Sequence, residues 1–270
     1  MKATALTLAV LLALVRLAPA QTNYAAASAK PLPTIDFLLQ QVVARAVSQE
    51  DKNDNLFDMN YQYTRTRTWE YRNSAGELKS REEKRSVENK ALRMATSAAA
   101  QPATPPTAVK NEPVSETHSN IHGKALKVKD YSIPNLVKRF QFTLVGRETL
   151  NGRPSLVVDF KPLNDHLPVN QFADNFINKA AGRAWIDEED YAIAQAQLHL
   201  TEQVNVLCGI VGAVWKFNFQ FTRLRTPEGY WFARSMDWHL EGREVVINRI
   251  VDYHERKLDE QKIMTTASAR

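Results

Sequence analysis

The chain has 270 residues, of which 44% are hydrophobic and 24% are charged, and its formal net charge is +5 at pH 7. A positive excess this small argues against a nucleic-acid-binding protein, because such proteins carry a much stronger basic surface. The single cysteine, Cys208, excludes an intrachain disulfide.

The first twenty residues have the pattern of a secretory signal peptide. Lys2 precedes an apolar run, and Ala18-Pro19-Ala20 forms a small-residue cleavage site. We expect cleavage before Gln21, a loose segment over residues 21–33 and a periplasmic location. An uncleaved membrane anchor is the alternative, but Arg16 interrupts a run that is already short for a bilayer span.

A helix and a polar hairpin are predicted next. Thr34 can cap a helix whose apolar residues recur at helical spacing as far as Val47, and the polar cluster 49–55 should end it. Residues 61–71 alternate as a strand, residues 73–76 form a turn and residues 78–88 return. A nucleic-acid platform is one interpretation of its Tyr-Tyr-Arg-Arg-Trp-Tyr stripe. For an exported protein we favour a sheet face whose arginine stems cover aromatic rings.

Residues 94–116 are dominated by Pro, Ala, Thr and Ser, which predicts a disordered insertion within the domain. A second hairpin follows over residues 139–162, because Asn151-Gly152 between alternating runs is a strong turn signal. A two-residue loop would place the apolar residues of the two strands on different faces. We therefore predict a three-residue loop, 150–152, that pairs Phe142 with Phe160, Leu144 with Val158 and Gly146 with Leu156.

The next segment predicts a second short helix over residues 168–181, stopped by Gly182. Strands over residues 182–187 and 191–200 then flank the acidic turn Asp187–Asp190. We expect this turn to be solvated, with a calcium site as the weaker alternative. The apolar connection 205–213 is expected to form a rim.

The last hairpin has its turn at residues 226–229 and is followed by a strand over residues 245–254 after a turn at Gly242. Alternation puts one aromatic face on this hairpin and a polar face behind it. The predicted register pairs Arg225 with Tyr230, Arg223 with Phe232, Phe221 with Arg234, Phe219 with Met236, Phe217 with Trp238 and Trp215 with Leu240.

These elements predict a mainly β (α+β) fold, in which a strongly curved antiparallel sheet carries two helices on its apolar side. Two short helices are too small to cover so many aromatic residues, so either the sheet closes or an apolar cavity remains. We expect a ligand to contact Arg223 and Arg234 with its head group, although both heads could instead reach water. The predicted cavity lining is Phe142, Phe160, Trp215, Phe217, Phe219, Phe221, Met236 and Trp238.

Catalytic and metal-binding signatures are absent from the sequence. H-E-x-x-H and G-x-S-x-G do not occur, so no enzymatic activity and no cofactor are expected. His118 and His122 have helical metal-ligand spacing without acidic or cysteine partners, and no metal is expected. Cys208 has apolar neighbours and is interpreted as a small buried hydrophobe.

Two motifs resemble a known family. They are F-x-L-V-G-R-E-x-x-N-G-R-P-x-x-V-x-D-F-K-P over residues 142–162 and G-R-A-W-I-D-x-x-D over residues 182–190. Together with the amphipathic helix and the aromatic hairpin, they resemble the periplasmic lipoprotein-carrier superfamily (LolA/LolB-like), particularly its outer-membrane-lipoprotein-sorting relatives. The resemblance covers roughly residues 33–258.

The resemblance implies an unclosed antiparallel β-barrel with helices as a lid over an apolar cavity. It implies a single domain over residues 34–258, followed by a loose tail over 259–270. The implied function is non-covalent holding of lipid acyl chains or a similar apolar ligand. We expect a monomer whose partners are a lipid or a lipidated protein and an inner- or outer-membrane protein. The alternative function is an envelope interaction or sensor module whose core is filled.

Overall fold

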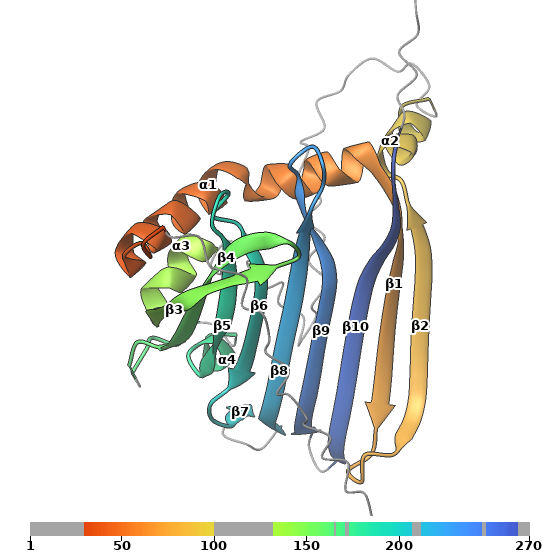
Figure 1. Ribbon diagram of the computed structural model, residues 1–270. Helices are drawn as coiled ribbons and strands as arrows, with labels where there is room; N and C mark the ends of the chain where they lie inside the picture. Colours follow the sequence, from red (N-terminus) through yellow and green to blue (C-terminus); the bar gives the residue numbers. More distant parts are fainter. Residues whose placement is uncertain are drawn as a thin grey trace, which may run out of the picture. The chain divides into compact units, whose positions relative to one another are not determined.

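Ten antiparallel strands form one sheet in the order β2-β1-β10-β9-β8-β6-β5-β4-β3, and β7 pairs with β8 beside this path (Figure 1). The computed structural model describes residues 30–99, 132–164, 166–170, 173–206, 212–244 and 247–263. The outermost strands, β2 and β3, lie at opposite ends of the order, so the sheet is not closed. This confirms the predicted mainly β class with an unclosed antiparallel sheet.

The strands are β1 (Tyr61–Arg72), β2 (Leu78–Glu88), β3 (Phe140–Leu150), β4 (Arg153–Pro162), β5 (Ala180–Asp187), β6 (Ile193–Leu200), β7 (Val204–Val206), β8 (Gly212–Arg225), β9 (Trp231–Glu244) and β10 (Ile247–Lys262). The helices are α1 (Ile35–Asn60), α2 (Lys90–Ala99), α3 (Ile133–Leu136) and α4 (Asp174–Ile177), with a 3-10 turn at Val137–Arg139. The predicted signal peptide, His118, His122, Phe172, Cys208 and positions 100–116 of the predicted insertion lie outside the described residues.

Helix α1 crosses one end of the sheet (Figure 1). Its N-cap is Thr34 as predicted, because the Thr34 hydroxyl accepts a hydrogen bond from the Phe37 amide at 3.3 Å. The prediction that the helix stops at the polar cluster 49–55 was wrong, since the helix continues to Asn60. The added turns carry Phe57, which is fully buried and stacks on Phe232 of β9. This tertiary contact outweighs the weak local helix signal.

The hairpin of β3 and β4 combines both registers that the sequence left in competition. Leu150 pairs with Arg153, so the loop has two residues, and the predicted three-residue loop was wrong. Asn151 and Gly152 have φ values of 51° and 77°, as a tight turn of this kind requires. A bulge between Leu144 and Gly146 then absorbs one residue, so the predicted pairs Phe142–Phe160 and Leu144–Val158 are confirmed. Gly146 pairs with Val157 and not with Leu156.

The predicted register of β8 and β9 was wrong by one residue next to the turn and by two residues beyond the first bulge. Phe221 lies opposite Met236, Phe219 opposite Trp238 and Phe217 opposite Leu240. A longer loop and a bulge between Thr222 and Arg223 cause the shift. Between the two bulges the shift is even, so Phe217, Phe219 and Phe221 keep their predicted face of the sheet. Arg223 lies opposite Ala233, and Trp215 is the extra residue of a second bulge.

The second predicted helix is much shorter than expected. Only Asp174–Ile177 is α-helical, and β5 begins at Ala180. Gly182 does not stop a helix but lies inside β5, where a Cβ atom would come within 2.8 Å of the Phe160 ring. Gly242 likewise lies within β9, and β10 extends to Lys262, past the predicted start of the tail at residue 259.

Candidate functional site

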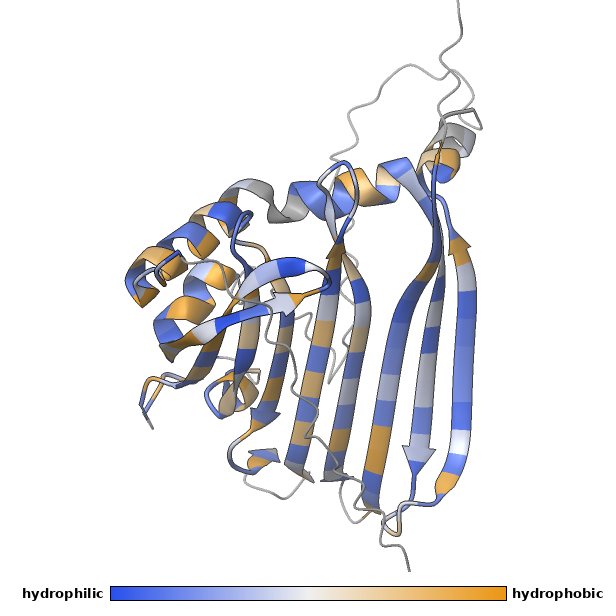
Figure 2. Ribbon diagram, viewed as in Figure 1, coloured by the Kyte–Doolittle hydropathy of each residue, from blue (hydrophilic) through white to orange (hydrophobic). Residues whose placement is uncertain are grey.

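The sheet has one apolar face and one polar face, because successive side chains of a strand point to opposite sides. Hydrophobic and hydrophilic residues alternate along β8 and β9 (Figure 2). Phe217, Phe219 and Phe221 lie on the apolar face, which α1 and α3 cover at one end. Leu38 and Val42 of α1 pack there against β4 and β5.

One cross-strand row of the apolar face runs in register through eight strands. We name it the aromatic row, although Leu198 and Gly182 interrupt the rings. Its rings contact one another: Trp238 stacks on Tyr253 at 5.4 Å between centroids, and Trp69 lies 5.1 Å from Tyr253. From β3 to β1 the row contains Phe142, Phe160, Gly182, Leu198, Phe219, Trp238, Tyr253 and Trp69.

An apolar cavity of about 270 Å³ lies between the helices and this face. Protein interiors rarely contain voids larger than a water molecule, so a space of this size distinguishes this end of the apolar face from a filled core. Every side chain that the described residues contribute to its wall is apolar. The wall consists of Leu39, Val42, Ile133, Leu136, Val137, Phe140, Phe142, Val158, Phe160, Ile177, Ala180, Ala184, Ile186, Ile193, Ala196, Leu198 and Phe221.

Three of the eight residues predicted for the cavity, Phe142, Phe160 and Phe221, stand in this wall. The half-buried residues Phe217, Phe219, Met236 and Trp238 extend the same face beyond the cavity. Trp215 lies apart from them. It is 41% exposed and hydrogen-bonds Glu241, whose side chain belongs to the polar face.

The two predicted head-group arginines lie in different places, and both have partners. Arg223 is 6% exposed beneath α1, with a nitrogen 3.9 Å from a carboxylate oxygen of Asp54. It shares a small pocket with Val42, Ile133 and Ile193, which also belong to the cavity wall. Arg234 pairs with Glu260. Arg223 is therefore the member of the pair that lies beside the cavity.

The first half of the acidic turn after β5 is buried, so the predicted solvated turn was wrong for Asp187 and Glu188, whereas the Glu189 side chain is 66% exposed. Asp187 is fully buried and accepts two hydrogen bonds from the Arg153 guanidinium, at 2.6 and 2.9 Å. Arg147 binds Glu188 in the same two-pronged way, at 2.6 and 2.8 Å. Both arginines come from the 142–162 motif, and both acids come from the 182–190 segment. Side chains of the two motifs therefore pair with each other, and these ion pairs connect the β3–β4 hairpin to the end of β5, which carries residues of the cavity wall.

The polar face contains a larger open groove of about 900 Å³. Two reciprocal pairs cross its β9–β10 border: His239 Nδ1 lies 2.6 Å from Asp252, and His254 Nδ1 lies 2.6 Å from Asp237. Asp159 pairs with Arg183 at its other side. The groove is lined by Asp159, Phe160, Ala181, Gly182, Arg183, Trp185, Gln197, Leu198, His199, Asn218, Phe219, Gln220, Asp237, Trp238, His239, Asp252 and His254. The main charged groups of the groove therefore pair with one another.

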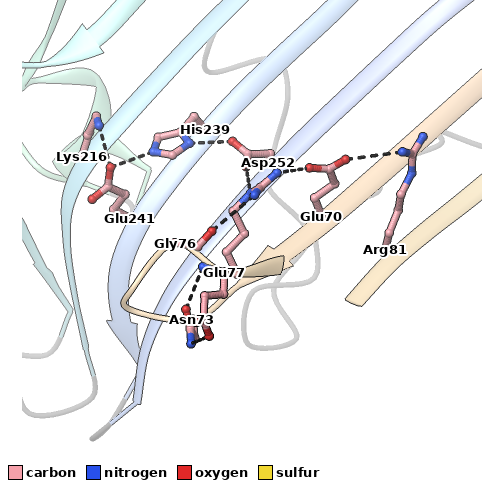
Figure 3. Close-up of polar contacts among 10 residues, drawn as sticks. Glu70, Asn73, Gly76, Glu77, Arg81, Lys216, His239, Glu241 and Asp252 are labelled. Carbon is pink, nitrogen blue, oxygen red and sulfur yellow. Dashed lines mark hydrogen bonds and ion pairs between the residues drawn. The ribbon is translucent and has the colours of Figure 1, made fainter. Parts of the chain in front are cut away.

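A chain of ion pairs continues from this groove to the edge of the sheet (Figure 3). Glu241 accepts hydrogen bonds from Lys216 at 2.6 Å and from His239 at 2.9 Å. On the other side of His239, Asp252 accepts one from Arg72 at 3.1 Å. The bond from Lys216, followed by that from His239, lowers the pKa of Glu241 to about 2. The chain ends at Glu70 and Arg81.

Glu241 should make stability depend on pH in the acid range. Its pKa of about 2 in the folded protein lies below the usual value of 4.5, so its contribution to stability is full above pH 4.5 and is lost as the pH falls towards 2. Replacing Glu241 with Gln should cost about 1 kcal/mol at pH 6 and almost nothing at pH 2. Urea unfolding at both pH values measures this. Glu244→Gln, at a pair whose carboxylate side chain is 67% exposed, is the control, and an equal loss at both pH values would contradict the assignment.

No group of three or more His, Cys, Asp or Glu side chains suited to a metal ion occurs within the described ranges. None of the helices in those ranges is both long enough and apolar enough to span a membrane.

Sequence reasoning missed several wall residues, namely Ile133, Leu136 and Val137, because the short helical segment 133–139 carries too few residues for a periodic signal. It also missed the His–Asp pairs. A signal for them exists, since β9 contains Asp237-Trp238-His239 and β10 contains Asp252-Tyr253-His254. Only the register shows that the two tripeptides face each other.

No family model and no curated protein matches the chain. Solved structures similar to it include a domain from Vibrio parahaemolyticus assigned to outer membrane lipoprotein sorting, with 9% identity, a TM-score of 0.30, and 86% of this chain and 93% of that chain covered. A LolA superfamily protein from Nitrosomonas europaea has 7% identity, a TM-score of 0.29, and coverages of 86% and 97%. A chain of the Pseudomonas aeruginosa MucA/MucB complex has 9% identity, a TM-score of 0.24, and coverages of 84% and 98%.

Proposed function

We propose that this protein is a non-enzymatic periplasmic binding or carrier protein for an acyl chain or another lipophilic molecule, acting in lipid or lipoprotein sorting to the outer membrane. The observation that carries the proposal is the cavity of about 270 Å³ with an entirely apolar wall. Apolar cavities of about 150 Å³ already take up benzene-sized guests. The export pattern of the first twenty residues supports the location.

The aromatic row supports a ligand longer than the cavity itself. Each buried methylene contributes about 0.8 kcal/mol, so roughly ten of them approach micromolar affinity before the cost of association. Phe160 and Leu198 belong to both the cavity wall and the aromatic row. We place one end of the ligand in the cavity and the rest along Phe219 and Trp238. At the cavity end, Arg223 is the candidate for contact with a second polar group of the ligand, such as an ester, and Arg234 is the alternative.

Native mass spectrometry of the mature protein, purified from its own cell envelope without detergent, tests this function. We expect a fraction of the protein to carry an added mass of a few hundred daltons that an organic solvent extracts. The extracted compound should be lipophilic and should rebind to the protein after delipidation. A protein that carries no such mass, and that does not take up a fluorescent fatty acid, would contradict the proposal.

The second candidate function is an envelope interaction or sensor module, in which a protein partner binds and the apolar face serves as core. The open polar groove of about 900 Å³ favours this function, because a protein partner needs a large exposed surface and not an apolar cavity. The same mass spectra separate the two functions, since an interaction module should retain protein and no lipid.

A further inference from the structure

A group of cations borders the apolar face on β1 and β10. Arg67 lies opposite Glu255, which lies opposite Met236, and Met236 lies opposite Phe221 of the cavity wall. This cross-strand row is adjacent to the aromatic row and closer to α1. Arg65, two residues before Arg67 on β1, lies opposite Lys257. The apolar face therefore ends in guanidinium groups, as the binding surface for an amphiphile would.

Arg65 and Arg67 share a single carboxylate. The Nε atoms of Arg65 and Arg67 lie 3.1 and 3.4 Å from the two oxygens of Glu255. One of these oxygens also accepts a hydrogen bond from the Tyr253 hydroxyl. Both Nε atoms are buried without a hydrogen bond, and within the described part of the chain the terminal guanidinium nitrogens donate none either. Glu255 is thus the anion beside both Nε atoms, and the terminal nitrogens of the partly exposed guanidinium groups are the donors that an added anion would use.

The charges of the group do not cancel. Three cations, Arg65, Arg67 and Lys257, face two carboxylates, Glu255 and Asp58, since Lys257 Nζ lies 3.7 Å from Asp58. Glu88 also lies near the arginines, but it pairs with Arg93 at 3.0 Å. One positive charge therefore remains in a partly buried place, where the side chains of Arg65 and Arg67 are 22% and 25% exposed.

We propose that Arg65 and Arg67 bind the anionic head group of the lipophilic ligand, a phosphate ester or a carboxylate, while its chain lies along the aromatic row. The inference rests on the function proposed above. The planar guanidinium fork matches the oxygens of both anions and holds them through paired hydrogen bonds. Partial burial strengthens the attraction, because the effective dielectric constant there is lower than in water.

Decyl phosphate and 1-decanol, which share one chain and differ in charge, provide the test. Each displaces a fluorescent apolar dye from the protein, and the ratio of their dissociation constants measures head-group recognition. We expect the natural protein to prefer decyl phosphate about tenfold. The double variant Arg65→Gln/Arg67→Gln should lose this preference and keep its affinity for decanol, which also shows that it is folded. Should the double variant fail to fold, Arg67→Gln alone should lose part of the preference.

The matched control is Arg81→Gln/Arg85→Gln, which removes the same charge from exposed positions of the neighbouring strand β2 and should leave the preference unchanged. Retention of the preference in the Arg65/Arg67 variant would overturn the proposal. So would its loss only in Arg223→Leu/Arg234→Leu, or binding of inorganic phosphate as tight as that of decyl phosphate. If the natural protein binds decanol as tightly as decyl phosphate, this inference alone is wrong. If neither probe binds, the proposed function is wrong.

Discussion

Replacing Ala184 with phenylalanine should reduce the affinity for a fluorescent fatty acid by at least about tenfold while leaving the protein folded. Ala184 lies in the cavity wall on β5, between Val158 and Ala196 of the neighbouring strands. A phenyl ring there projects into space that a ligand would need. Overpacking a full core costs about 1–3 kcal/mol, but filling an existing cavity commonly adds about 0.5–2 kcal/mol. Stability should therefore stay the same or rise.

The same strand offers a matched control for this variant. Ala181 lies on β5 with its side chain on the polar face, in the groove. Ala181→Phe adds the same ring on the other side of the sheet and should leave fatty-acid binding unchanged. Ala196→Phe, on the next strand of the cavity wall, should repeat the loss. Titrations of the three variants with urea unfolding alongside decide the matter, and unchanged binding in Ala184→Phe would argue against occupancy of the cavity.

Replacing Asp187 with asparagine should lower the free energy of unfolding by about 3 kcal/mol, because it breaks a buried ion pair and leaves Arg153 only the exposed Glu189, at 2.9 Å, and the more distant Asp190, at 3.7 Å. The Asp187 carboxylate also accepts hydrogen bonds from the amides of Glu189 and Asp190, at 3.1 and 2.8 Å. It therefore holds the turn between β5 and β6 as well as the arginine. A loss of this size should lower the melting temperature by roughly 6–12 °C.

The comparison for this prediction is a pair with the same chemistry and different exposure. Asp159 accepts two hydrogen bonds from Arg183, at 2.6 and 3.0 Å, but its side chain is 45% exposed. Asp159→Asn should cost less than about 1 kcal/mol, because water screens an exposed pair. Thermal and urea unfolding of both variants measure the difference. Equal losses would mean that burial of Asp187 does not govern its contribution.

Local patterns in the sequence were enough to identify most strands and their faces. Asn151-Gly152 marked the turn between β3 and β4, and Thr34 marked the start of α1. The alternation of aromatic and polar residues in β8 placed Phe217, Phe219 and Phe221 on one face, and the structure retains that assignment. These signals are short-range, because side-chain direction in a strand repeats every two residues wherever the strand pairs.

Long-range contacts set what the sequence left open. The bulge near Val145 and the bulges of β8 let a preferred turn coexist with a preferred buried face. The positions of these bulges depend on pairing with the neighbouring strands. Asp187 looked like part of a solvated turn because its partner Arg153 comes from another hairpin. Helix α1 continues to Asn60 because Phe57 stacks on Phe232, which lies far away in the sequence.

The sequence by itself determined the strand content, the two faces of the sheet and the surplus of apolar side chains on one of them, since all three follow from residue type and spacing. The tertiary structure alone decided the cavity, the buried turn at Asp187 and the cationic border at Arg65 and Arg67. Those features depend on register and on which side chains from distant segments fill a shared space, and neither quantity is encoded in any single stretch of the chain.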